Sequence, residues 1–328
     1  MEAASSELSN PNNVTQLPLV LHHYNQKYKD NPISNLIRTR FRLLEVSDPF
    51  FPALSSSVRV LLCVGISAVT SETLDQLPSL ECVVGSSVGV NHVDVAECRR
   101  RGIRVTTAGD AYTEDVADYA VGLLIDVLRR LSSADRFVRD GMWASKGDYP
   151  LASKLGGKRV GIVGLGSIGS EIAKRLGAFG CIIAYNSRKK KTHVTFPFYE
   201  TAHDLARNSD ALILCCTLTN ETRHLINKDV MKALGKTGVI VNVGRGPLID
   251  EKESVQCLLQ GLIGGAALDV FENEPHVPEE LLALDNVVLS PHGAMATPES
   301  FSALVSVILG NLDAFFANQP LLSEMKLK

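Results

Sequence analysis

Three residues with reactive side chains lie near the ends of short apolar segments in the last third of the chain. Arg245 follows Val239–Val243, His292 follows Val287–Leu289, and Glu274 lies between them. An arginine can hold a carboxylate through two parallel hydrogen bonds, and a histidine can give a proton to a developing alkoxide near neutral pH. A neighbouring carboxylate would orient that histidine and stabilise its charged form. Each residue alone is more often structural or solvated, but the three together favour acid–base chemistry on a carboxylate-bearing substrate.

A glycine-rich segment provides the second chemical signal. The apolar run Val160–Val163 ends in Gly164-Leu165-Gly166-Ser167-Ile168-Gly169, and a helical pattern, Ser170–Phe179, follows at once. In this order Gly164 permits a tight turn, Gly166 lets the backbone approach a pyrophosphate, and Gly169 lets helix and strand pack closely. The helix N-terminus would attract the phosphates. The segment therefore predicts dinucleotide binding, and the alternative is an ordinary strand-to-helix turn.

The next predicted strand, Cys181–Tyr185, indicates which dinucleotide is bound. An NAD-selective site usually has an acidic residue at the end of this strand, to bind the ribose 2′-hydroxyl. Here the strand is followed by Asn186-Ser187-Arg188-Lys189-Lys190-Lys191. The basic residues would attract a 2′-phosphate, whereas a carboxylate would repel it. We expect NADPH to be preferred and NAD to bind at lower affinity; the alternative is a solvated basic loop.

Composition excludes several other classes of protein. The 328 residues are 45% hydrophobic and 21% charged with a net charge of −3, which gives no general attraction for nucleic acid or an anionic membrane. No apolar run is expected to approach the roughly 20 residues that span a bilayer. The seven cysteines are scattered, which predicts reduced thiols, no metal site and a cytoplasmic location. Residues 1–16 are polar and predict a disordered tail.

Alternating strand and helix patterns predict an α/β fold with two doubly wound parallel sheets. The first set of predicted strands is Leu17–Leu21, Arg42–Val46, Val58–Val64, Cys82–Gly85 and Ile103–Thr107. The second set is Arg159–Val163, Cys181–Tyr185, Ala211–Cys215, Val239–Val243, Ala266–Val270 and Val287–Leu289. A long helix is expected over about Thr113–Arg139 and a final one over Pro298–Ala317.

Five segments, in this order, carry a family resemblance. They are Ser87–Asp94, Gly164–Gly169, Asn242–Gly246, Leu268–Pro275 and Ser290–His292. With them the chain resembles the D-isomer-specific 2-hydroxyacid dehydrogenases from about residue 40 to 320. Within that family it looks most similar to the plant glyoxylate/hydroxypyruvate reductases and their hydroxyphenylpyruvate-reducing branch.

The resemblance implies a function and a role for each site residue. It implies NADPH-dependent reduction of small 2-oxo acids, with Arg245 on the substrate, His292 as acid/base and Glu274 as its partner. Backbone N–H groups of Val88 and Gly89 would hold the substrate carboxylate, and Asp269 the nicotinamide carboxamide. Further cofactor contacts are implied at Gly164, Leu165, Gly166, Ser167, Ile168, Gly169, Ser187, Arg188, Lys189, Cys216, Thr217, Val243, Gly244 and Gly293. It also implies a homodimer and a part in photorespiration.

The family's topology implies a Rossmann cofactor domain inserted into a flavodoxin-like substrate domain. The substrate domain would then comprise residues 17–110 and 298–328, and the cofactor domain residues 111–297. The two chain crossings would form a hinge.

Two departures from the commonest family pattern affect the pocket rather than the catalytic groups. Thr217 stands where many members have proline, and the small pair Gly293-Ala294 follows His292 where many have a bulkier residue. Two other functions stay open. A biosynthetic NAD-dependent enzyme, such as one acting on phosphoglycerate, would be expected to have an acid near Asn186 and often a regulatory domain beyond Lys328. An NAD(H)-sensing corepressor of the same fold could keep the catalytic residues, but the basic loop argues against it.

Overall fold

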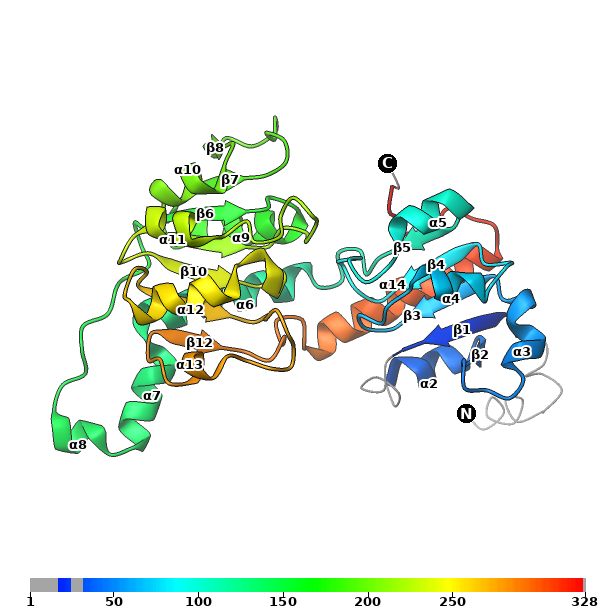
Figure 1. The fold of residues 1–328 in the computed structure, drawn as a ribbon, viewed down its shortest axis with the longest axis horizontal. Coiled ribbons are helices and arrows are strands. Elements are labelled where there is room, and N and C mark those ends of the chain that lie inside the picture. Colours follow the sequence, from blue (N-terminus) through cyan, green and yellow to red (C-terminus); the bar gives the residue numbers. More distant parts are fainter. Residues whose placement is uncertain (1–16, 25–31, 327–328) are drawn as a thin grey trace, which may run out of the picture. The chain divides into compact units, whose positions relative to one another are not determined.

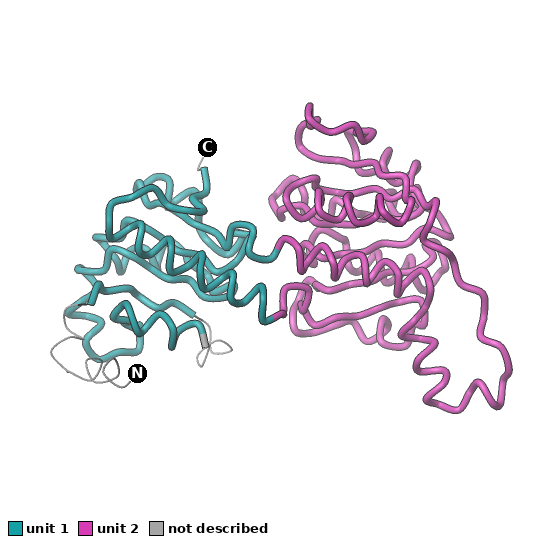
Figure 2. Tube along the Cα trace, turned by 180° about the vertical axis from the view of Figure 1, so that it is seen from behind, with its two compact units in different colours: residues 1–112, 298–328 teal, residues 113–297 magenta. Residues whose placement is uncertain are grey.

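The computed structural model describes residues 17–24 and 32–326; the predicted tail, residues 1–16, lies outside them. Two compact units make up the chain, residues 1–112 with 298–328 and residues 113–297 (Figure 2). The chain leaves the first unit once and returns to it once, so the second unit is an insertion.

A five-stranded parallel sheet forms the centre of the first unit (Figure 1). Its strands are β1 (Leu19–His23), β2 (Arg42–Leu44), β3 (Val60–Cys63), β4 (Cys82–Gly85) and β5 (Arg104–Thr106). Every residue of β3 and β4 is buried, so both faces of the sheet are covered. The strand order β2-β1-β3-β4-β5 is that of the flavodoxin-like fold.

The helices of this unit are short except for the last. They are α2 (Pro32–Arg38), α3 (Phe51–Leu54), α4 (Ser71–Asp75), α5 (Val95–Arg101) and α14 (Pro298–Phe316). Among the described residues, α14 alone is long and apolar enough to cross a membrane by length and composition, so the expectation that no apolar run approaches this length was wrong. One side of α14, including Leu304, Ile308 and Leu312, is buried in this unit, and the helix packs against β4. The core helix of a soluble protein can meet the same criterion of length and composition, so this finding is weak evidence for a membrane span.

The second unit contains a seven-stranded parallel sheet (Figure 1). Its strands are β6 (Arg159–Val163), β7 (Ile182–Asn186), β8 (Phe198–Tyr199), β9 (Ala211–Leu214), β10 (Val239–Asn242), β11 (Gly265–Leu268) and β12 (Val287–Leu289). The order β12-β11-β10-β9-β6-β7-β8 is the Rossmann order extended by one strand, and it reverses between β6 and β9. The predicted fold class is confirmed, while β8 is a strand that the sequence did not predict.

The helices of the second unit begin with one that is broken. They are α6 (Thr113–Arg129), α7 (Leu131–Arg139), α8 (Met142–Lys146), α9 (Ser167–Ala178), α10 (Ala202–Arg207), α11 (Lys228–Leu234), α12 (Glu251–Leu259) and α13 (Glu279–Leu282). The single helix predicted over Thr113–Arg139 was wrong because Arg130 has a left-handed backbone, with φ 54°. The carboxylate of Asp126 accepts hydrogen bonds from the N–H and hydroxyl of Ser132 across this break.

Candidate active site

The predicted site residues of the second unit follow the carboxyl ends of its strands. All strand pairs in this sheet are parallel, so these ends lie at one edge, where α/β folds bind ligands. The turns that follow the strands contain Gly164–Gly169 after β6, Ser187–Lys191 after β7, Cys215–Thr217 after β9, Val243–Arg245 after β10, Asp269 after β11 and Ser290–Ala294 after β12.

The glycine-rich turn has the geometry of a phosphate cradle. Gly164 has φ +102°, and a Cβ there would lie 2.6 Å from the Cα of Cys216. A Cβ on Gly169 would lie 2.1 Å from the carbonyl oxygen of Gly164, whereas one on Gly166 would meet open space. Helix α9 begins at Ser167, three residues before the predicted start, and no side chain caps its N-terminus. The turn thus fits a pyrophosphate at the helix end, and a side chain on either outer glycine would close it.

The turn after β10 fixes Arg245. The buried side chain of Asn242 accepts from the N–H of Gly244 (3.1 Å) and donates to the carbonyl oxygen of Arg245 (2.9 Å). Burial lowers the pKa of the Arg245 guanidinium, and the charge of Glu274 opposes this shift. A partly buried arginine stays charged at neutral pH and gains strength as a carboxylate ligand.

Glu274 and His292 form the predicted pair. Nδ1 of His292 lies 2.8 Å from Oε2 of Glu274, and the N–H of Phe271 donates to Oε1 (3.1 Å). Burial raises the pKa of Glu274, but the hydrogen bond and charge of His292, with the N–H of Phe271 and the charge of Arg245, outweigh it and lower the pKa below its usual value. The carboxylate is therefore ionised at neutral pH, which suits a partner for a protonated histidine. With Nδ1 on Glu274, Nε2 of His292 is the atom available to a substrate.

Asp269 holds the turn that carries His292. Its carboxylate, 1% exposed, accepts from Ser290 Oγ (2.5 Å) and from the N–H groups of Gly293 (2.7 Å) and Ala294 (3.1 Å), and its carbonyl oxygen accepts from the N–H of His292 (2.8 Å). His292 has φ 55°, so these bonds stabilise a left-handed backbone. The sequence suggested a helix cap or a nicotinamide contact for Asp269; the structure adds this positioning role.

Several supporting contacts were missed in the sequence because they join distant segments. The hydroxyl of Tyr119 on α6 lies 2.6 Å from Ser290 Oγ, which extends the network around Asp269 into a helix. Nε2 of His224 lies 2.6 Å from Oε1 of Glu272, two residues before Glu274. A Cβ on Gly246 would lie 1.9 Å from the carbonyl carbon of Phe271, so the turn of Arg245 packs against the segment of Glu274.

The remaining predicted residues lie on two loops and have local contacts: the hydroxyl of Ser87 donates to the carbonyl oxygen of Gly89 (2.8 Å), and that of Ser187 to the carbonyl oxygen of Lys189 (2.7 Å). Val88 and Gly89 belong to the first unit, on the loop after β4, where Val88 is 43% exposed. Arg188 and Lys189 are exposed on the loop after β7. Within residues 17–24 and 32–326, no group of three His, Cys, Asp or Glu side chains could hold a metal ion.

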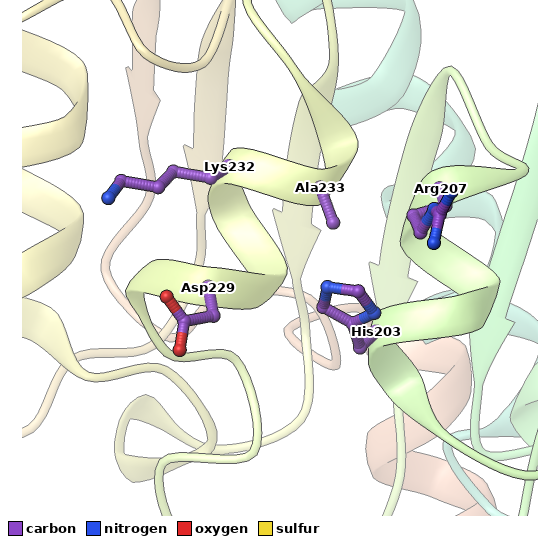
Figure 3. Close-up of a pocket in the computed structure, with 5 residues that line it drawn as sticks. All are labelled: His203, Arg207, Asp229, Lys232 and Ala233. Atoms are coloured by element: carbon purple, nitrogen blue, oxygen red, sulfur yellow. The ribbon is translucent and has the colours of Figure 1, made fainter.

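A hollow elsewhere on the second unit contains none of these residues. It has a volume of about 550 Å³ and is lined by His203, Arg207, Asp229, Lys232 and Ala233 of α10 and α11 (Figure 3). Neither the glycine-rich turn nor the pair Glu274–His292 contributes to it, so we do not assign it to the reaction.

Comparison with known families identifies the class of protein. The sequence model of the "D-isomer specific 2-hydroxyacid dehydrogenase, NAD binding domain" matches residues 121–294, which lie within the second unit and include the glycine-rich turn, Arg245, Glu274 and His292. The chain belongs to the D-isomer-specific 2-hydroxyacid dehydrogenase family.

Its relatives are more specific. A glyoxylate/hydroxypyruvate reductase of Arabidopsis thaliana is 59% identical over 278 residues, covering 85% of this chain and 86% of that protein. A hydroxyphenylpyruvate reductase of Plectranthus scutellarioides is 46% identical over 274 residues, covering 84% of this chain and 87% of that protein. The crystal structure of an NADPH-dependent glyoxylate/hydroxypyruvate reductase from Sinorhizobium meliloti, in complex with NADP and malonate, is similar with a TM-score of 0.87 and 38% identity, covering 94% and 97% of the two chains.

Proposed function

We propose that this protein is an NADPH-dependent reductase that converts small 2-oxo acids, glyoxylate and hydroxypyruvate first, into D-2-hydroxy acids. The observation that carries the proposal is the 2.8 Å contact between His292 and an ionised Glu274, on the sheet edge that also presents Arg245 and the glycine-rich turn. The named activities of the relatives above support the same reaction.

The chain's own residues have distinct roles in this reaction. Bound NADPH supplies a hydride for C2 of the oxo acid. Arg245 binds the carboxylate and polarises the ketone, and protonated His292 donates from Nε2 to the forming alkoxide. Glu274 stabilises the charged imidazole until the proton has left, and Asp269 keeps the turn of His292 in position. We propose the N–H groups of Val88 and Gly89 as further carboxylate ligands in the substrate domain, and residues 113–297 as the cofactor domain.

The cofactor site follows from the cradle and the charges after β7. The N-terminus of α9, with Leu165, Gly166, Ser167 and Ile168, would hold the pyrophosphate. Ser187, Arg188 and Lys189 would hold the 2′-phosphate. Thr217, with Cys216, Val243, Gly244, Asp269 and Gly293, would line the remainder of the site.

The size of the substrate depends on the residues beside His292. The carboxylate contacts recognise only the oxo-acid end of the substrate. Because Gly293 and Ala294 are small, they leave room for a bulkier side chain, and we propose that larger acids such as hydroxyphenylpyruvate are also reduced, at a lower rate than glyoxylate. The test is NADPH oxidation with glyoxylate, hydroxypyruvate, pyruvate, hydroxyphenylpyruvate and phosphohydroxypyruvate at matched concentrations, repeated with NADH. Reduction of phosphohydroxypyruvate alone, or of a simple ketone in place of the oxo acids, would contradict the proposal.

Location and assembly are further parts of the proposal. All seven cysteines are free, which suits a reducing cytoplasm. We propose a homodimer because the segment of α7 and α8 exposes Leu131, Val138, Trp143 and Leu151. As a reductase of glyoxylate and hydroxypyruvate, the protein would take part in photorespiration.

A further inference from the structure

We propose that Tyr185, through its buried hydroxyl group, positions the basic run Arg188–Lys191 for the 2′-phosphate of NADPH. The inference rests on the proposed NADPH dependence. It assigns a role in cofactor selectivity to a residue of strand β7 whose side chain is fully buried.

The contact that carries the inference joins strand β7 to the loop after it. The side chain of Tyr185 is fully buried, with 0% exposure, and its ring packs against Phe198 with centroids 5.4 Å apart. The N–H of Lys191 donates to its hydroxyl oxygen at 2.7 Å. A buried tyrosine hydroxyl needs a hydrogen-bond partner, and here that partner is the backbone of the basic run.

Other contacts hold the two ends of this loop but not its middle. At the ends, the N–H of Tyr185 donates to the carbonyl oxygen of Pro197 (3.0 Å), and the side chain of Asn186 donates to those of Tyr199 (2.9 Å) and Glu200 (3.0 Å). Of the hydrogen bonds described for residues 187–197, the one from Lys191 is the bond that ties the middle of the loop to the sheet. Removing it would leave the loop attached but free to spread.

Repulsion between its positive charges favours more open conformations of this loop. Arg188, Lys189, Lys190 and Lys191 are four successive cations that repel one another, and no ion pair is described for any of them. The one described carboxylate whose pKa their charge affects is that of Glu221; the hydrogen bond of Thr219 lowers this pKa most, then that of its own backbone, and the charge of Arg188 lowers it further. Ordering long basic side chains around a phosphate opposes binding, so a loop already held in place binds the phosphate more tightly. NADH has no 2′-phosphate and would gain nothing from this restraint, which makes the effect selective.

The first experiment measures binding without turnover. In Tyr185→Phe, we expect the dissociation constant of adenosine 2′,5′-bisphosphate, measured by calorimetry, to rise about 3- to 10-fold, the effect of one hydrogen bond. Binding of 5′-AMP should stay within about twofold, and the KM for NADPH should rise while kcat and the KM for NADH do not. Tyr199→Phe, on the neighbouring strand, is the matched control and should change none of these.

A second pair of variants tests the donor of this hydrogen bond, the N–H group of Lys191, instead of the acceptor. Lys191→Pro deletes the N–H group, and Lys191→Ala keeps it while removing the same charge. The proline variant should bind adenosine 2′,5′-bisphosphate about 3- to 10-fold more weakly than the alanine variant, the effect of one hydrogen bond. Where Tyr185→Phe folds, combining it with Lys191→Pro should add no further loss. These variants also test the inference if Tyr185→Phe fails to fold.

The outcomes separate this inference from the proposed function. Equal losses for the bisphosphate and for 5′-AMP, or additive effects in the double variant, would overturn the role of Tyr185. A wild-type protein that binds both ligands equally would instead refute the proposed NADPH preference, and the inference with it. Loss of bisphosphate binding in Arg188→Ala but not in Tyr185→Phe would leave the function standing and reject the inference alone.

Discussion

The carboxylate of Glu274 contacts groups that keep it both ionised and fixed. His292 and the N–H of Phe271 each take one of its oxygens, and Arg245 adds a favourable charge. Its side chain is 27% exposed and that of His292 is 32% exposed. The pair is thus supported from the protein side and open on the other, as proton donation to a bound substrate requires.

Replacing the histidine tests the proton donor. His292→Ala should lower kcat by about 10²-fold or more, the range of general acid catalysis. NADPH binding, measured by fluorescence titration, should persist because the phosphate cradle is untouched. Turnover close to that of the unchanged protein would eliminate His292 as the donor.

Replacing the glutamate tests its partnership with the histidine. In Glu274→Gln the protonated form of His292 loses a stabilising charge, so the pH profile of kcat for reduction should move toward lower pH. Since the pKa of Glu274 is below its usual value, this carboxylate does not itself titrate between pH 6 and 9, and the shift reports on the histidine. Glu280→Gln, at an exposed position of α13, is the control. An unmoved profile would show that the two side chains do not act together.

Among the secondary-structure elements, the end of β6 and the first turn of α9 lie very close together at Gly164 and Gly169. Gly169 brings the first turn of α9 against the carbonyl oxygen of Gly164, and any side chain there must push the helix from the strand end. The same helix contains Gly177, where a Cβ would meet nothing within 4 Å. The two glycines form a natural comparison within one element.

Gly169→Ala should therefore weaken NADPH binding by at least about tenfold and destabilise the fold by about 1–3 kcal/mol, the usual cost of overpacking. Gly177→Ala should leave binding unchanged and raise stability by up to about 1 kcal/mol, because alanine is the better helix former. Urea unfolding and cofactor titration on both variants measure these effects. Similar behaviour of the two variants would show that the helix tolerates displacement at the turn.

Strand β1 of the first unit contains a buried titratable group, His22. Burial lowers its pKa from 6.5 to about 4, with the charge of Glu45 opposing the shift. Between these values the unfolded chain binds a proton that the folded chain does not. The free energy of unfolding therefore does not depend on the titration of His22 above pH 6.5. As the pH falls from 6.5 toward 4, it decreases by about 1.4 kcal/mol per pH unit and by about 3 kcal/mol in total.

His22→Gln removes the titrating group and should flatten this dependence. Urea midpoints of both proteins at pH 7, 6 and 5 give the slopes, and the difference between the variant and the original should shrink as the pH falls. Identical slopes would assign the acid sensitivity to other groups.

At the scale of the whole molecule, one segment of the second unit, α7, α8 and the residues that follow them, exposes several large apolar side chains close together in the sequence. Trp143, the chain's one tryptophan, is 62% exposed there, and Leu151 is 98% exposed. The rings of Phe137 on α7 and Tyr149 after α8 pack edge to face, with centroids 5.1 Å apart, and join the two ends of this segment. An ordered segment with such a surface is expected to be covered by a partner, and a second copy of this chain is the proposed one.

Trp143→Lys should convert the proposed dimer to a monomer, because it introduces a charge into an apolar interface. Light scattering after size exclusion gives the mass, and the emission of Trp143 in the unchanged protein should shift to longer wavelength on dilution. Phe50→Lys, at a residue that is 66% exposed in the first unit, is the control. A monomer at all concentrations would reject the dimer.

Much of this protein could be predicted from local sequence. Strand positions followed from apolar runs between turns, and all but β8 were found to within a few residues, because parallel strands buried on both faces must be apolar. The cofactor turn followed from glycines whose backbone requirements are local. Net charge after β7 is likewise a local property, and it predicted the cofactor that a structural relative binds.

The tertiary structure decided the contacts between residues that are distant in the sequence. Tyr119 reaches Ser290 across 171 positions, His224 reaches Glu272 across 48, and Asp269 holds the turn of His292 through bonds to residues 21 to 25 positions away. Such pairs depend on which strands become neighbours and on how the helices pack over them. Neither the strand order nor the helix packing can be predicted from one local segment of the sequence. The sequence by itself determined which chemical groups the protein has and the turns that carry them. The order of the strands decided which groups meet, because only folding brings the ends of separate strands to one edge.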